Sequence, residues 1–213
     1  MTTFPTNLRL FFGPLAATIL AVGVAALARR VPGYSHTSQT VSEIGELGSP
    51  ARVPFSILLL CVALCVLVFA SGVRDRARQA GHSRSVAYLI GAMAVSVAGV
   101  GVFAYPHPLH NVFGLSELVG YQAPLAFAIA WRCDPQGRAL VRFSWFMSFV
   151  VWLAIALNLT SLDRHGSLWE LIGPYYGLAQ RALFAGWFGW CGVVGILLAR
   201  PRGEPGAYFA EAR

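Results

Sequence analysis

The chain has 213 residues, of which 56% are hydrophobic and only 12% are charged. A soluble domain carries about 25% charged residues because its surface faces water, so this composition excludes an ordinary soluble protein. The net charge of +7 could indicate a nucleic-acid-binding protein, but every basic residue is an arginine at the end of an apolar run, with no continuous basic stripe. We therefore expect a membrane protein of one domain with no nucleic-acid partner.

Six apolar stretches are long enough to cross a bilayer. A helix needs about 20 mostly apolar residues to span the hydrocarbon core. The sequence predicts an all-α, polytopic six-transmembrane-helix bundle that forms a single domain over residues 1–213, with spans at about 10–28, 53–73, 85–105, 112–131, 143–161 and 176–199. The first stretch is longer than the apolar part of a typical signal peptide, so we retain it as a membrane span.

The arginines predict the orientation of these spans, because cytoplasmic segments of membrane proteins are enriched in basic residues. With the N-terminus inside, eleven arginines fall in inner segments and five in outer ones, while four acidic residues fall inside and five outside. The inner segments then carry the whole net charge of +7. We expect both termini to be cytoplasmic, in the cell's inner (plasma) membrane, with the functional face extracytoplasmic.

The longest outer segment runs from residue 31 to 52 and is rich in hydroxyl groups. Thr40 and Glu43 have the spacing of a capping box, and Gly48 with Pro50 is a plausible helix end. This pattern predicts a helix of about two turns lying on the outer surface. Thr40 and Glu43 have two alternative roles: they cap this helix, or they take part in catalysis.

The second outer segment leads into the fourth span. Pro108 suits the first position of a helix, with His107 at the N-cap. Farther along, His110, Glu117 and Tyr121 lie on one helical face. Because an ionised carboxylate is costly in a membrane, Glu117 should face the bundle interior, be paired or be protonated. Arg181 is the expected partner, in a pair that is either structural or functional.

Outer histidines and acids allow two interpretations. In the first, they form a hydrolytic site, with His110, Glu117 and His165 as catalytic candidates and with His107, His110 and His165 as candidate ligands of a metal such as zinc. In the second, they form a hydrogen-bonded cluster that contacts lipid headgroups. The candidate ligand-binding residues are Tyr34, His36, Ser42, Glu43, His107, His110, Glu117, Tyr121, Asp163, His165 and Arg181.

Small residues predict where helices pack closely, since they let helix backbones approach one another in lipid. One such ridge lies on the third span (Ala87, Gly91, Ala94, Ala98, Gly101) and one on the sixth (Ala182, Ala185, Gly186, Gly189, Gly192). These ridges also offer contacts for a homo- or hetero-oligomer. Trp131 is expected near an interface, whereas Trp152, Trp187 and Trp190 either line an internal space or pack in the bundle.

Three motifs carry a family resemblance. They are Gly33-Tyr-Ser-His-Thr-Ser-Gln-Thr-Val-Ser-Glu-Ile-Gly45 followed by Gly48-Ser-Pro50, the run Gly99-Val-Gly-Val-Phe-Ala-Tyr-Pro106 with His107 and His110 after it, and Gly166-Ser-Leu-Trp-Glu170. With these motifs the chain resembles the prokaryotic membrane-protein family called domain of unknown function 998. The resemblance implies a single six-helix domain and assigns no reaction.

Three classes of function remain. The first is the binding, sensing or transfer of a lipid or small apolar molecule through a polar pocket at the outer end of the bundle. The second is an intramembrane hydrolase or transferase that uses the histidine and carboxylate groups, with or without zinc. The third is an accessory subunit of a larger membrane complex. The first class requires only a pocket, whereas catalysis requires a specific arrangement of side chains. We therefore favour the first class.

Overall fold

The computed structural model describes residues 4–134 and 137–200, and all regular secondary structure within them is helical. Six stretches have the length and apolar composition of membrane spans: Thr6–Ala28, Arg52–Gln79, Ser85–Val102, Pro108–Ala130, Arg138–Leu162 and Ser167–Ala199. The prediction of an all-α, six-span membrane protein is confirmed. Four residues of the charge tally (Arg202, Glu204, Glu211 and Arg213) lie outside the described residues.

The longer helices account for the spans, and short 3₁₀ turns join some of them. The elements are α1 (Thr6–Leu10), α2 (Phe12–Ala28), η1 (Ser42–Gly45), α3 (Arg52–Gln79), α4 (Ser85–Val102), α5 (Pro108–Gly120), α6 (Ala123–Ala130), α7 (Arg138–Leu159), η3 (Thr160–Leu162), α8 (Ser167–Ile172), η4 (Gly173–Tyr175) and α9 (Tyr176–Ala199).

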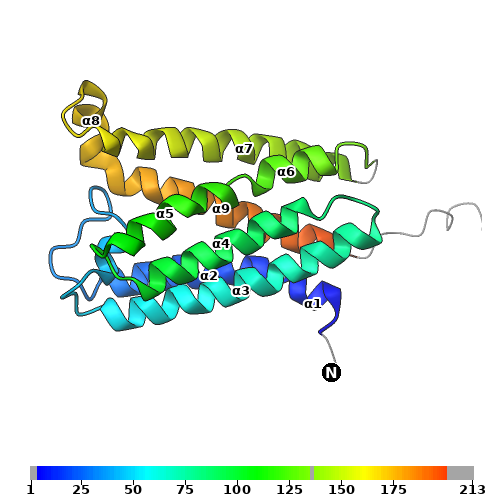
Figure 1. Cartoon of the computed structure of the whole chain (residues 1–213), viewed down its shortest axis with the longest axis horizontal. Coiled ribbons are helices and arrows are strands. Elements are labelled where there is room, and N and C mark those ends of the chain that lie inside the picture. The colour runs from blue at the N-terminus through cyan, green and yellow to red at the C-terminus, as the bar shows by residue number, and fades with distance from the viewer. Residues whose placement is uncertain (1–3, 135–136, 201–213) are drawn as a thin grey trace, which may run out of the picture.

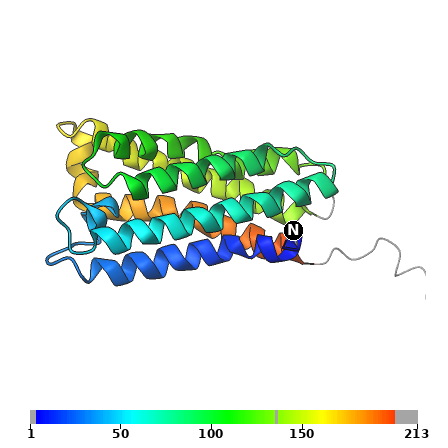
Figure 2. The same cartoon turned by 60° about the horizontal axis from the view of Figure 1, so that its bottom comes forward.

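Successive spans pack side by side, and the sixth packs against the first. Thus α2 packs on α3, α3 on α4, α4 on α5, α6 on α7, α7 on α9, and α9 on α2. The helices run along the long axis of the molecule, with α1 and the last turn of α9 at the same end (Figures 1 and 2). After the predicted orientation, we call this the inner end, and we call the opposite end, which carries α8, the outer end.

Helix ends differ from the predicted spans where polar residues continue a helix or proline ends one. The second span reaches Gln79 rather than residue 73, because arginine is a good helix former and its charge can reach out of the apolar layer. The third span ends at Val102 rather than residue 105, since Pro106 disfavours helical conformation at Tyr105. The fifth begins at Arg138 rather than residue 143.

The fourth span is divided into α5 and α6 where a continuous helix was predicted. Pro124 lies in the first turn of α6 and has no N–H to donate to the carbonyl of Gly120. That carbonyl instead accepts a hydrogen bond of 2.9 Å from Nε1 of Trp187 on α9. The break therefore ties α5 to α9 in the bundle interior, where Trp187 is fully buried.

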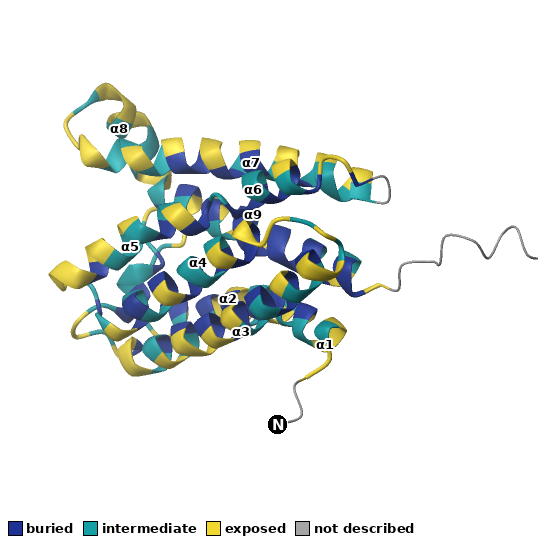
Figure 3. Ribbon diagram, turned by 45° about the vertical axis from the view of Figure 1, so that its right-hand side comes forward, coloured by how far each residue is buried: buried dark blue, intermediate teal, exposed yellow. Residues whose placement is uncertain are grey.

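Burial follows the pattern of a protein surrounded by lipid. Large apolar side chains are exposed in mid-span, as on α7, where Phe146, Phe149 and Leu153 are all more than half exposed. Figure 3 shows exposed residues along the outward side of each span and buried ones facing inward. Trp152 belongs to the exposed face of α7, whereas Trp187 and Trp190 pack in the core. Trp131, predicted near an interface, is also buried in the core.

Glycines permit the closest helix contacts. A Cβ at Gly195 of α9 would lie 2.5 Å from the carbonyl oxygen of Leu10, and a Cβ at Gly101 of α4 would lie 2.9 Å from Cβ of Leu59 on α3. Within the predicted ridge of the third span, Gly101 thus meets α3, whereas a Cβ at Gly91 would have open space. The ridge of the sixth span is not one interface: Gly186 lies near α7 and Gly192 near α2, whereas Ala182, Ala185 and Gly189 are exposed.

Two glycines of α9 give a matched test of this packing. We expect Gly195→Ala to lower the free energy of unfolding by about 1–3 kcal/mol, because the added methyl group has no room beside Leu10 and Pro14. Gly189 has open space around it, so Gly189→Ala should be neutral or slightly stabilising through its better helix propensity. Unfolding midpoints in detergent measure both, and equal effects would contradict the packing described here.

Candidate functional site

The longest outer segment, residues 29–51, folds over the outer end of α9 and is held there by Arg181. Nη1 of Arg181 donates to the carbonyl oxygens of His36 (2.9 Å), Gln39 (2.9 Å) and Gly177 (2.8 Å), and Nη2 donates to the hydroxyl of Tyr34. Its Nε is buried and has no partner among the described residues. One guanidinium therefore satisfies three backbone carbonyls and fixes the segment.

Further contacts bring the segment directly onto the helix. The N–H of Val41 donates to Oε1 of Gln180 (2.6 Å), and the N–H of Leu178 donates to the carbonyl of Thr37 (3.1 Å). A Cβ at Gly177 would meet the carbonyls of Gln39, His36 and Thr37, so only glycine allows this approach. Hydrogen bonds and close backbone packing therefore fix the segment to the outer end of α9.

The phenol of Tyr34 joins this network outside the membrane spans. Its hydroxyl donates to the carbonyl of Thr40 (2.7 Å) and accepts from Arg181. Burial raises the pKa of Tyr34 above its ordinary value of 10.0, and the nearby positive charge of Arg181 offsets part of that rise. Tyr34 is thus a neutral hydrogen-bonding group at physiological pH.

The predicted capping box is confirmed. The N–H of Thr40 donates to Oε1 of Glu43 (3.0 Å), and the N–H of Glu43 donates to Oγ1 of Thr40 (3.3 Å). The helix that follows is the four-residue 3₁₀ turn η1 rather than the two turns predicted. The extended backbone at Glu46 ends it. Glu43 also accepts from Nε2 of Gln39 (2.9 Å), so its carboxylate organises the segment from within.

Ser42 and His110 meet between η1 and α5. Nε2 of His110 lies 3.0 Å from Oγ of Ser42, and its Nδ1 lies 2.7 Å from the carbonyl oxygen of Phe103. His110 is buried in the first turn of α5. His107, as predicted, is the N-cap of that helix: its Nδ1 accepts from the N–H of Leu109 (3.1 Å). The ring of His107 stacks on Phe103.

The predicted pair between Glu117 and Arg181 does not form. Glu117 is buried in the bundle interior, as expected, but its Oε2 accepts a hydrogen bond from the hydroxyl of Tyr121 one turn along (2.9 Å). None of the ion pairs among the described residues includes either Glu117 or Arg181. The reason is that the folded outer segment supplies carbonyl groups that occupy the Arg181 guanidinium.

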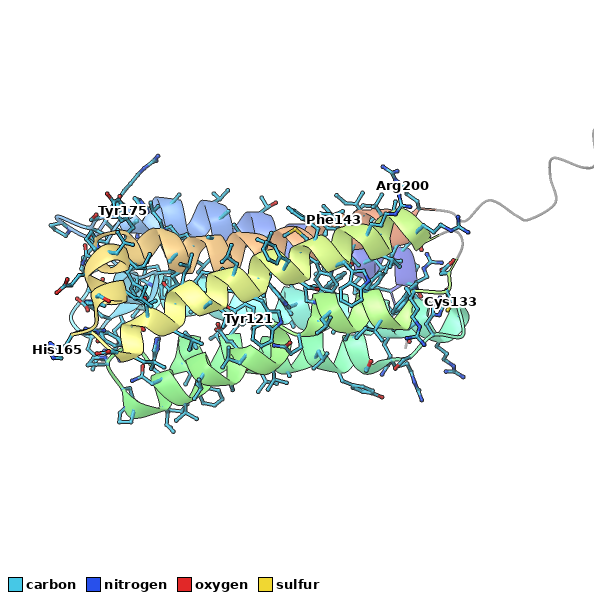
Figure 4. All side chains as sticks on the ribbon, turned by 90° about the horizontal axis from the view of Figure 1, so that it is seen from above. Tyr121, Cys133, Phe143, His165, Tyr175 and Arg200 are labelled. Atoms are coloured by element: carbon cyan, nitrogen blue, oxygen red, sulfur yellow. The ribbon has the colours of Figure 1, made fainter. Side chains whose placement is uncertain are left out.

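The remaining candidates do not join the others. Oδ1 of Asp163 accepts from the N–H of His165 (3.2 Å) in the exposed turn between η3 and α8. Figure 4 places His165 at the extreme outer end and Tyr121 at mid-depth, where α5 meets α6. Across residues 4–134 and 137–200, no three His, Cys, Asp or Glu side chains gather in a way that could hold a metal ion. The structure therefore does not support the zinc site considered for His107, His110 and His165.

A lateral groove of about 290 Å³ opens between α2 and α9 below the outer segment. Its walls are mainly apolar, and His36 and Arg181 lie at its outer end. Its lining residues are Ala17, Leu20, Ala21, Val24, Ala25, His36, Val41, Arg181, Phe184, Ala185 and Phe188. Because alanines stand where the two helices face each other, their small side chains leave this space unfilled.

Behind the groove lies a smaller space of about 30 Å³, which we call the inner cavity. Ser42 and Glu117 both line it. Four residues line the groove and the inner cavity alike, and so form the wall between them: Leu20, Val41, Phe184 and Phe188. The volume of the inner cavity suits about one water molecule, and its polar groups suit that occupant.

The pocket thus differs from the one expected. The sequence predicted a polar pocket at the outer end of the bundle, whereas this groove is mainly apolar and opens sideways between α2 and α9. Trp187 and Trp190 do not line it and pack in the core. A signal for it was present in the spacing of Ala17, Ala21 and Ala25, one every four residues, which places them on one face of α2. Nothing in the spacing alone distinguishes such a stripe from a packing ridge.

Arg181 can be tested as the anchor of the outer segment. We expect Arg181→Gln to increase amide hydrogen exchange in residues 34–41, because three carbonyls and the Tyr34 hydroxyl lose their donor. Arg164→Gln is a matched control, since Arg164 is exposed at the same end and contacts only the ring of Trp169 among the described residues. Unchanged exchange in Arg181→Gln would refute the anchoring role.

The buried hydrogen bond between Tyr121 and Glu117 predicts a coupled effect. We expect Tyr121→Phe to lower the free energy of unfolding by about 1–3 kcal/mol, because it leaves a buried carboxyl group without its donor. In a Glu117→Met background the same substitution should cost much less. A double-mutant cycle of unfolding in detergent measures this coupling, and strictly additive costs would argue against the hydrogen bond.

Comparison with known proteins identifies a family for this chain. A family model described as a protein of unknown function, DUF998, matches residues 14–197. No curated protein and no solved structure matches the chain. The match covers all six spans apart from a few terminal residues, and it includes the three motifs noted in the sequence. The chain belongs to the DUF998 family.

Proposed function

We propose that the protein binds a lipid, or another amphiphile with an apolar chain, in the lateral groove between α2 and α9. The observation that carries this proposal is the groove itself: it is apolar along its length and has a cationic group at its outer end. An apolar chain would lie between the alanines of α2 and the phenylalanines of α9. The headgroup would lie beside His36 and Arg181.

The size of the groove favours one chain. Its volume of about 290 Å³ is at the small end of ligand pockets, which measure about 300–1,000 Å³. Such a space accommodates one acyl chain and excludes the body of a large ligand. Because the groove opens sideways between two spans, a lipid can enter from the bilayer without crossing water.

The charge at the outer end favours an anionic headgroup. No carboxylate balances the positive charge of Arg181 among the described residues, because the partners of its guanidinium are neutral carbonyl and hydroxyl groups. A cation at this depth is costly for a membrane protein and is commonly linked to function. A phosphate or carboxylate near the guanidinium would compensate this charge in a medium of low dielectric constant.

We also infer that this end of the groove faces the extracytoplasmic side of the plasma membrane. The asymmetry of the arginines supports this orientation, with eleven arginines assigned to inner segments and five to outer ones. The polar end of the groove would then lie at the level of the outer leaflet headgroups.

Filling the groove tests the proposal. We expect Ala21→Trp and Ala185→Trp to reduce co-purifying lipid on the order of tenfold, because a misfit of about 1.4 kcal/mol already weakens binding by that factor. Native mass spectrometry of protein purified in mild detergent measures the bound lipid. Ala156→Trp, at an exposed position of α7 outside the groove, is the control. Equal lipid on all three variants and the wild type would rule out the groove as the binding site.

A further inference from the structure

The contact between Ser42 and His110 has the geometry of a nucleophile and its base. The two side chains come from parts of the chain 68 residues apart and meet at 3.0 Å, within hydrogen-bond reach. Ser42 is the first residue of η1, and the capping box of Thr40 and Glu43 holds its backbone in place. His110 projects from the first turn of α5. Both groups are therefore positioned by local structure before they meet.

The carbonyl of Phe103 determines which nitrogen of His110 carries a proton. A carbonyl oxygen can only accept, so Nδ1, at 2.7 Å from it, must be the donor. In the neutral imidazole, Nε2 is then the acceptor, and it faces the hydroxyl of Ser42. A third group thus orients the base toward the nucleophile, which is the role an aspartate has in serine hydrolases. Glu117 does not take that role here, because its hydrogen-bond donor is Tyr121.

Ser42 is separated from the lateral groove by a single layer of side chains. Ser42 lines the inner cavity, which shares the wall of Leu20, Val41, Phe184 and Phe188 with the groove. Movement of one side chain in this wall would join the two spaces. An ester group carried by a chain in the groove would then reach the Ser42 hydroxyl, and the inner cavity has room for about one water molecule.

We propose that Ser42 and His110 form an acyl-transfer site that acts on a carboxylic ester of an amphiphile held in the lateral groove. The substrate class rests on the proposed lipid-binding function, whereas the reactivity of Ser42 does not. Ser42 is the nucleophile and His110 is the general base. This assignment uses His110 as the sequence suggested, adds Ser42 as its partner, and gives no part to His165.

The reaction balances without a metal or a redox partner. Oγ of Ser42 forms a bond to the ester carbonyl carbon while its proton passes to Nε2 of His110. The ester C–O bond then breaks, and His110 gives that proton to the departing alcohol oxygen, which leaves an acyl-serine. Water attacks the acyl-serine, His110 takes and returns a proton, and the products are a carboxylic acid and free Ser42.

A long-chain alkyl fluorophosphonate tests the nucleophile directly, because such a reagent phosphonylates an activated serine and releases fluoride. With the full chain purified in detergent, we expect a single adduct by intact mass and its location on Ser42 by peptide mapping. Ser42→Ala should give no adduct. His110→Gln should slow labelling by about 10²-fold or more, which is the usual contribution of a general base. Ser49→Ala is the control and should label as the wild type does, since among the described residues the hydroxyl of Ser49 bonds to backbone groups of Ile44 and Ala51 and to no histidine.

Each outcome bears on the proposal. Absence of labelling in a folded wild-type protein, labelling that persists in Ser42→Ala, or an unchanged rate in His110→Gln would each overturn it. Unfolding midpoints show whether each variant is folded, and Ser42→Cys, which should react with a long-chain alkyl iodide, offers a second measure of reactivity at the same position. Loss of labelling with co-purifying lipid retained would refute only the acyl-transfer site. Labelling with lipid unaffected by Ala21→Trp and Ala185→Trp would refute the lipid-binding proposal and the substrate class that rests on it, but not the reactivity of Ser42.

Discussion

The guanidinium of Arg181 donates hydrogen bonds to three backbone carbonyls at the outer end of the bundle. Two of them, of His36 and Gln39, belong to irregular backbone that folds onto the bundle, and the third belongs to Gly177 of α9 itself. In a membrane protein, irregular backbone persists near lipid only where protein groups supply the hydrogen bonds that water otherwise would. Together with the contacts of Val41 and Leu178, this side chain fixes the position of the outer segment and of the outer end of the groove.

The same constraint explains two further features of the outer half. Pro124 frees the carbonyl of Gly120, and the indole of Trp187 occupies it, which fixes α5 against α9. The end of α4 frees the carbonyl of Phe103, and the imidazole of His110 occupies it. In each case a side-chain donor compensates for a helix that ends or breaks. At His110 the compensation also sets the tautomer, so a structural requirement leaves Nε2 available to Ser42.

Sequence reasoning reached the spans, the capping box of Thr40 and Glu43 and the N-cap at His107, because these depend on residues close together in the chain. It also placed Glu117 in the interior, because the position of a residue around its helix determines whether a carboxylate is buried or faces lipid. It was wrong about the partner of Arg181. That partner depends on how residues 34–39 fold back over α9, and no local pattern contains this information. The meeting of Ser42 with His110, 68 residues away, lies beyond local pattern for the same reason.

If the groove binds a lipid and Ser42 is a nucleophile, recognition and chemistry lie on opposite sides of one apolar wall. A chain entering from the bilayer meets only alanine, leucine, valine and phenylalanine side chains until its polar end reaches Arg181 and His36. The hydroxyl of Ser42 lies behind Leu20, Val41, Phe184 and Phe188, at a space that suits about one water molecule. Such an arrangement would separate binding from reaction: a bound amphiphile would be held by its chain and its charge, and would reach Ser42 only when the wall moved. Lipids that merely pass along the outside of α2 and α9 would not be exposed to the nucleophile.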